Sequence, residues 1–107
     1  MSREILLLRQ AVVFVGRFCC YCGEKATHAD HILAQSLGGE EVAENLIATC
    51  STCNCKKGNR FLSDESFNKA KFQAFVNAPL VQDLVRHLLA IHSPLVKTDS
   101  LIELSFQ

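Results

Sequence analysis

The stretches Cys19-Cys20-Tyr21-Cys22-Gly23 and Cys50-Ser51-Thr52-Cys53-Asn54 each contain a Cys-x-x-Cys pair. Structural zinc is usually held by four ligands at the corners of a tetrahedron, and two such pairs supply four thiolates. Gly23 lets the chain turn tightly, so that backbone N–H groups can face the thiolates. The spacing therefore predicts a structural Zn²⁺ bound by Cys19, Cys22, Cys50 and Cys53. Cys20 and Cys55 are expected to be spare buried thiols, with a swap of ligand register left open.

The six cysteines in 107 residues would form disulfides in a secreted chain. The apolar stretch 5–15 is interrupted by Arg9 and Gln10 and is followed by no Ala-x-Ala site, so it does not resemble a signal peptide. It is also too short to span a membrane. We expect a cytoplasmic chain without membrane contact, in which paired cysteines hold metal. Disulfides and a redox-active Cys19–Cys22 dithiol remain alternatives.

The length and composition predict one domain over residues 1–107. The hydrophobic fraction of 49% and the mean hydropathy of +0.15 exclude a disordered chain. Eleven basic and eleven acidic residues give a net charge of zero. This balance does not favour a nucleic-acid partner, because tight non-specific binders are usually basic. A local basic patch could still meet phosphates.

The first half of the chain reads as a mixture of helix and short strands, which predicts an α+β fold. Residues 2–15 favour a helix with Ser2 as its N-cap, although the β-branched residues at 12–15 leave a strand open. Residues 27–33 and 46–49 are predicted strands, residues 36–39 a turn, and residues 40–45 an acidic loop. The segment 50–58 leads from the second strand into a short helix.

The segment 61–107 is predicted to be helical. A first helix over residues 63–77 carries an apolar stripe of Phe61, Phe67, Ala70, Phe72, Phe75 and Val76. A second helix begins with Pro79 at its first position, and Pro94 ends it. Its apolar face is formed by Leu80, Val81, Leu84, Val85, Leu88, Leu89 and Ile91. Both stripes are expected to be core, with a partner helix or a dimer contact for residues 80–91 as the alternative.

Between the cysteine pairs lie Asp30-His31-Ile32, Ser36-x-Gly38-Gly39 and Asn45-Leu46-Ile47, and the second pair continues as Asn54-x-x-Lys57-Gly58. This order resembles the HNH endonuclease family, in its four-cysteine, zinc-containing branch. The resemblance covers residues 19–60. It implies a small ββα-metal (His-Me finger) core with zinc knuckles, flanked here by an N-terminal helix and C-terminal helices.

The resemblance also implies a role for each matching residue. His31 would be the general base, and Asn45 would hold the loop and orient the histidine. Asp30 and Asn54 would hold a catalytic Mg²⁺ or Mn²⁺. The residues expected to contact the phosphates of DNA are Lys56, Lys57 and Arg60. The stretch Leu33-Ala34-Gln35 departs from the family, which commonly has a proline soon after the Asp-His pair.

The chemistry of these residue types agrees with such roles. A hard divalent cation prefers carboxylate and amide oxygens, and an imidazole can accept a proton near neutral pH. Because adjacent strand residues point to opposite faces, the strand must end, twist or bulge at Asp30 and His31 if both serve one site. His28, His87 and His92 are expected at the surface.

The sequence thus predicts a metal-dependent DNA endonuclease that nicks one strand, acting as a monomer or a weak homodimer. Family-level analogy places such a chain in phage, prophage or mobile-element DNA processing. The alternative is a non-catalytic zinc module that binds nucleic acid or protein. That module would need the cysteines but not Asp30, His31 or Asn54. A thiol redox protein is a third possibility.

Overall fold

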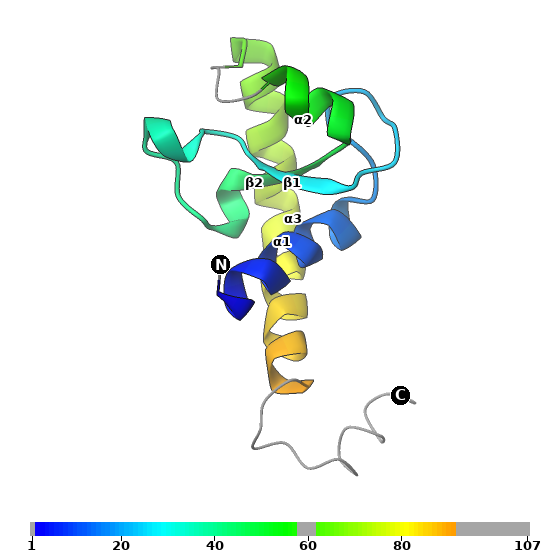
Figure 1. Cartoon of the computed structure of the whole chain (residues 1–107), viewed down its shortest axis with the longest axis vertical. Helices are drawn as coiled ribbons and strands as arrows, with labels where there is room; N and C mark the ends of the chain where they lie inside the picture. The colour runs from blue at the N-terminus through cyan, green and yellow to red at the C-terminus, as the bar shows by residue number, and fades with distance from the viewer. Residues whose placement is uncertain (1, 58–61, 92–107) are drawn as a thin grey trace.

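The computed structural model describes residues 2–57 and 62–91 and shows an α+β arrangement (Figure 1). Helix α1 spans Arg3–Gly16, and strands β1 (His28–His31) and β2 (Leu46–Thr49) form a two-stranded sheet. Helix α2 (Ser51–Lys57) follows β2 directly, and the long helix α3 spans Asp64–Ile91. Two single-turn 3₁₀ helices, η1 (Gln35–Leu37) and η2 (Ala43–Asn45), lie between the strands. The sequence of β1, β2 and α2 is the predicted ββα unit.

The N-terminal helix was predicted, and its start is capped as expected. The hydroxyl oxygen of Ser2 accepts a hydrogen bond from the Ile5 N–H, which satisfies one of the unpaired donors of the first turn. The helix then buries Leu7, Ala11 and Val12 against the rest of the molecule. At its end Gly16 lies against β2, where an added Cβ would stand 2.6 Å from the Cβ of Ala48. The helix therefore packs on the sheet with no room for a side chain at that point.

The two strands are antiparallel, with Asp30 opposite Ile47 and His31 opposite Leu46. All four residues of β2 are buried. Because neighbouring strand residues point to opposite faces, Leu46 and Ile47 join different core clusters. Leu46 packs with residues of α1 and the second half of α3, and Ile47 with Cys20, Ile32 and the first half of α3. The sheet is thus covered on both faces.

The C-terminal segment forms one helix, α3, where the sequence predicted two. Pro79 lies inside it rather than at a helix start. A proline within a helix leaves the carbonyl four residues earlier without its hydrogen bond, at a cost of about 3 kcal/mol. Pro79 and Phe75 are both on the exposed side, so that carbonyl can be hydrated. The buried stripe of Ala70, Ala74, Ala78 and Val81 runs past the proline without interruption and offsets this cost.

The core prediction for α3 was wrong for several large side chains. Phe72 and Phe75 are 71% and 72% exposed, and Val76 and Leu80 are also exposed. The helix instead packs through alanines, which let it lie close to the sheet and to α1. Figure 1 shows α3 running the length of the molecule, with its last turns extending past α1. In the described ranges, 2–57 and 62–91, no helix combines the length and apolar character needed to cross a membrane.

Candidate metal sites and the surroundings of His31

The four predicted zinc ligands come together at one place. The sulfur atoms of Cys19, Cys22, Cys50 and Cys53 lie within 4.8 Å of one another. The Sγ atoms of Cys22 and Cys50 are 3.5 Å apart, and the backbone N–H of Cys53 points at Cys50 Sγ over 3.4 Å. Zn–S bonds of about 2.3 Å place sulfurs about 3.8 Å apart in a tetrahedron. The four cysteines therefore form a cluster that fits zinc, as the spacing predicted.

The electrostatics of these thiols also call for a cation. Burial opposes ionisation of Cys19, but backbone groups of Cys50, Cys22 and Tyr21 outweigh it and lower the pKa of that thiol to about 6. The neighbouring thiols of Cys22 and Cys50 raise the pKa of Cys53 to about 12. A divalent cation bound among the four sulfurs would favour their thiolate forms.

The two remaining cysteines differ from each other. Cys20 is buried in the core cluster beside Ile47, and burial raises the pKa of its thiol. Cys55 is exposed on α2, so the prediction that it is buried was wrong. All six cysteines are free thiols in the described part of the chain. The register of Cys19, Cys22, Cys50 and Cys53 is the one whose sulfurs converge.

Asp30 is a buried carboxylate with an incompletely satisfied oxygen. Lys57 Nζ lies 3.0 Å from Asp30 Oδ2 and donates a 2.7 Å hydrogen bond to the backbone carbonyl of His31. The ammonium is within ion-pair distance of Oδ2, yet this buried atom accepts no hydrogen bond of good geometry. Nearby, burial and then the Asp30 charge raise the pKa of Tyr21, whose hydroxyl is also buried without a partner among the described residues. A buried carboxylate oxygen in this state fits the ligand chemistry of a hard cation.

Lys57 occupies an unexpected place. The sequence assigned it to the phosphates of DNA, but it is only 8% exposed and its ammonium faces the interior. A phosphate could reach it only if the contact with Asp30 changed. Lys56 beside it is exposed on α2, and the third predicted phosphate ligand, Arg60, lies outside the described residues.

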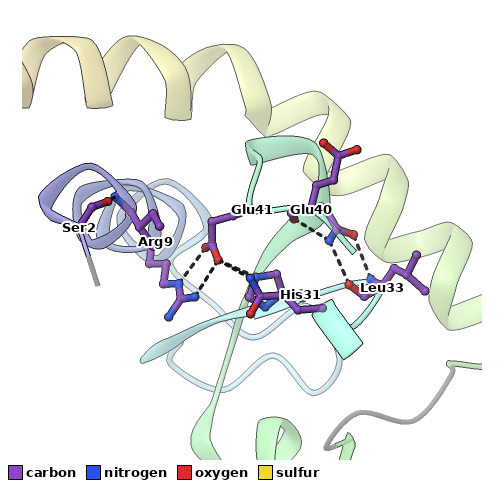
Figure 2. Close-up of polar contacts among 9 residues, drawn as sticks. Ser2, Arg9, His31, Leu33, Glu40 and Glu41 are labelled. Atoms are coloured by element: carbon purple, nitrogen blue, oxygen red, sulfur yellow. Dashed lines mark hydrogen bonds and ion pairs between the residues drawn. The ribbon is translucent and has the colours of Figure 1, made fainter. Parts of the chain in front are cut away.

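Asn45 contacts the loop that follows β1 through its side-chain amide. Its Oδ1 accepts the Leu33 N–H, and its Nδ2 donates to the carbonyls of Leu33 and Glu40, at 2.9–3.1 Å. Its own carbonyl accepts the Ile32 N–H at 2.8 Å. Gly39 lies against the same loop, where an added Cβ would stand 1.7 Å from the Leu33 carbonyl oxygen. These contacts tie the backbone at Leu33, just after His31, to the backbone at Glu40 (Figure 2).

His31 is the last residue of β1, and its ring contacts Glu41, a residue that the sequence did not single out. His31 Nε2 lies 2.9 Å from Glu41 Oε1. Arg9 of α1 donates two hydrogen bonds to the same carboxylate, from Nε at 2.9 Å and from Nη2 at 2.8 Å (Figure 2). The hydrogen bonds from Arg9, with a smaller contribution from His31, lower the pKa of Glu41 to about 2. No sequence signal links residues 9, 31 and 41, because only the fold brings them together.

The predicted catalytic residues are brought together only in part. Asp30 and His31 are adjacent at the end of β1, but their side chains contact different partners, Lys57 and Glu41. Asn54 is half-buried in α2, with its backbone N–H on the Cys50 carbonyl. Across the described residues no hydrogen bond joins it to Asp30. His28 and His87 are exposed, as expected, and His92 lies outside the described residues.

Comparison with known proteins gives one family. A sequence model described as HNH endonuclease matches residues 19–83, which is more than half of the chain. No curated protein and no solved structure matches it. The matched segment contains both cysteine pairs, the two strands, α2 and most of α3, and it leaves out α1.

Proposed function

The chain belongs to the HNH endonuclease family, and from that premise we propose that it is a divalent-metal-dependent DNA endonuclease that nicks one strand. It would hydrolyse a phosphodiester to a 5′-phosphate and a 3′-hydroxyl. The proposed base is His31, and the proposed ligands of the catalytic Mg²⁺ or Mn²⁺ are Asp30 and Asn54. The coarser conclusion, a nuclease-type or nucleic-acid-binding domain, follows from the family itself.

One observation supports catalysis more than any other. At the end of β1 the buried Asp30 carboxylate, whose Oδ2 lies 3.0 Å from Lys57 Nζ but accepts no hydrogen bond of good geometry, stands next to a half-buried imidazole that is held by a carboxylate. Asn45 pins the backbone immediately afterwards through three side-chain hydrogen bonds. A zinc module that only bound nucleic acid would have no need to bury Asp30 or to fix the ring of His31.

The proposed reaction assigns one task to each residue. The divalent ion, when bound at the oxygens of Asp30 and Asn54, supplies charge stabilisation for the phosphoryl oxygens and the leaving oxygen. His31 takes a proton from the water that attacks phosphorus, in line with the departing 3′-oxygen. Asn45 keeps the loop after His31 in place. The 3′-oxygen leaves with a proton from solvent, so charge and atoms balance.

Partner and assembly follow from the same proposal. Lys56, two residues after the proposed ligand Asn54 on α2, is an exposed cation and is our candidate for a phosphate contact. With a net charge of zero the domain would hold DNA through few ion pairs, so binding should be weak and local. A single site per chain would cut one strand, and a double-strand break would need a weak homodimer or a second event. We place the protein in the cytoplasm, where thiols remain free to hold zinc.

The test is a supercoiled-plasmid assay on the zinc-loaded full chain with added Mg²⁺ or Mn²⁺. Wild type should produce relaxed circles, and His31→Ala should slow their formation by about 10²–10⁴-fold, the usual contribution of a general base. His28→Ala is the matched control, because His28 is an exposed histidine on the same strand. It should nick at the wild-type rate.

Two results would reject the proposal. One is the absence of relaxed circles from folded, zinc-loaded wild type with either ion. The other is equal activity of His31→Ala and wild type. If the wild type shifted DNA in a gel but never nicked it, the non-catalytic zinc module would be the better description.

A further inference from the structure

Glu41 contacts His31, and Arg9 holds Glu41 from outside the segment that matches the family. Arg9 lies in α1, before the matched residues 19–83. Glu41 lies in the loop between η1 and η2. The side chains of Arg9, Glu41 and His31 are 29%, 14% and 15% exposed, so the contact is largely shielded from solvent. Neither the family match nor the motif assigns a role to this pair.

The carboxylate of Glu41 is unusually well fixed. Oε2 accepts from Arg9 Nε, and Oε1 accepts from the Arg9 guanidinium, from His31 Nε2 and from Gln35 Nε2 at 3.2 Å. A two-pronged contact between guanidinium and carboxylate defines the orientation of the carboxylate as well as its place. Figure 2 shows the Glu41 carboxylate between Arg9 and His31, while the neighbouring Glu40 carboxylate points away from the ring.

The Glu41 carboxylate decides which ring nitrogen of His31 carries the proton. An ionised carboxylate has only acceptors, so a hydrogen bond between Glu41 and His31 requires the proton on Nε2. The lone pair of the neutral imidazole is then on Nδ1. A histidine whose other nitrogen donates to a carboxylate is fixed in both tautomer and ring orientation.

We propose that Glu41, oriented by Arg9, is a positioning residue for His31, holding the Nε2–H tautomer so that Nδ1 is the atom that takes the proton from water. This inference rests on the proposed function of His31 as a base. Arg9 has two tasks in it. Its guanidinium fixes the Glu41 carboxylate, and its positive charge offsets the negative charge of Glu41 where a DNA phosphate must approach.

The first experiment measures the tautomer directly and needs neither DNA nor a catalytic ion. Long-range ¹H–¹⁵N spectra of zinc-loaded, ¹⁵N-histidine-labelled full chain distinguish a protonated from an unprotonated ring nitrogen. Neutral His31 should be in the Nε2–H form in wild type and in Glu40→Ala, the matched control. In Glu41→Ala it should become a mixture of both tautomers. The same mixture in wild type would overturn the proposal.

The second experiment measures nicking kinetics on the same variants. Glu41→Ala should lower kcat by about 10–100-fold with KM changed by less than about twofold, the range typical for lost orienting partners. Arg9→Ala should lower kcat by less, and the double variant should be no slower than Glu41→Ala alone because the two act as a unit. Circular dichroism and zinc content confirm that each variant is folded.

The outcomes separate this inference from the proposed function. If wild type nicks and Glu41→Ala has the kcat of wild type and Glu40→Ala, the positioning role is wrong while the nuclease stands. If wild type does not nick, the proposed function is wrong, and the tautomer measurement alone decides whether Glu41 holds the ring. A loss confined to KM would assign Glu41 to DNA binding and likewise overturn the positioning role.

Discussion

The cysteine cluster and the surroundings of His31 are assembled in different ways. The cluster takes its ligands from two Cys-x-x-Cys pairs, one in the loop after α1 and one at the start of α2, and local spacing places the two sulfurs of each pair. His31 depends on side chains far away in the chain, with Arg9 in α1 and Glu41 in a loop. A metal bound at the cluster would hold four groups at once. The ring is held by ion pairs and hydrogen bonds that single substitutions can remove.

This difference indicates that the cysteine cluster should determine stability, while the surroundings of His31 should determine the proposed activity. A zinc ion bound there would fix both cysteine pairs and, through them, the ends of the sheet and the start of α2. The side-chain contacts of His31 can be lost without unfolding the region that the cysteine pairs hold together. Changes in the first region should therefore alter folding, and changes in the second should alter mainly function. The following predictions test this separation.

The largest effect is expected from removing zinc. Structural zinc sites contribute on the order of 10 kcal/mol to folding, so a strong chelator or Cys50→Ser should unfold the domain. Thermal unfolding followed by circular dichroism measures the change. Cys55→Ser is the matched control, because Cys55 is an exposed thiol on the same helix. It should leave the midpoint unchanged. A cooperative transition in the chelated protein at the wild-type temperature would break the comparison.

A smaller loss of stability is expected from Asn45→Ala. This removes three side-chain hydrogen bonds that join a residue only 7% exposed to backbone groups of Leu33 and Glu40. Each lost hydrogen bond contributes about 0.5–1.5 kcal/mol, so the free energy of unfolding should fall by about 2 kcal/mol or more in denaturant titration. Zinc content should be unchanged. Asn68→Ala, an exposed position on α3, should shift it by less than about 0.5 kcal/mol.

The smallest effect concerns pH. A carboxylate whose pKa is depressed in the folded state stabilises that state above its unfolded pKa, and the contribution is lost as pH falls towards the folded value. For Glu41 this window runs from about 4.5 down to about 2. We expect its ¹³C carboxyl resonance to show no titration step near pH 4.5 while the protein is folded. A step at that pH, with the fold intact, would show that Arg9 does not hold the carboxylate.

Much of the fold could be read from the sequence because its signals are local. The Cys-x-x-Cys spacing predicted the cluster, Ser2 marked the start of α1, and the apolar residues 46–49 predicted β2. The position of Asn45 in the family motif predicted that it would hold the loop. Each of these signals is a short local pattern, even where the contacts, Cys22 with Cys50 and Asn45 with Leu33, join residues 28 and 12 positions apart.

The missed features depend on tertiary packing. Pro79 reads as a helix start, but the buried alanines before it and Val81 after it share one packing surface, which keeps α3 continuous. Phe72 and Phe75 read as core by size, whereas Ala74 and Ala78 are the residues that are buried. Lys57 reads as a surface cation, and its long side chain instead reaches inward to Asp30. The Arg9–Glu41 contact had no local signal at all.

The position of Arg9 has a practical consequence for anyone who cuts or grafts this domain. A fragment that began at Cys19 would retain every residue of the family motif and all four zinc ligands. It would lack the α1 side of the core and the guanidinium that orients Glu41. Such a fragment could bind metal and still cut slowly. The smallest transferable unit therefore begins at Ser2, upstream of the motif by the whole length of a helix.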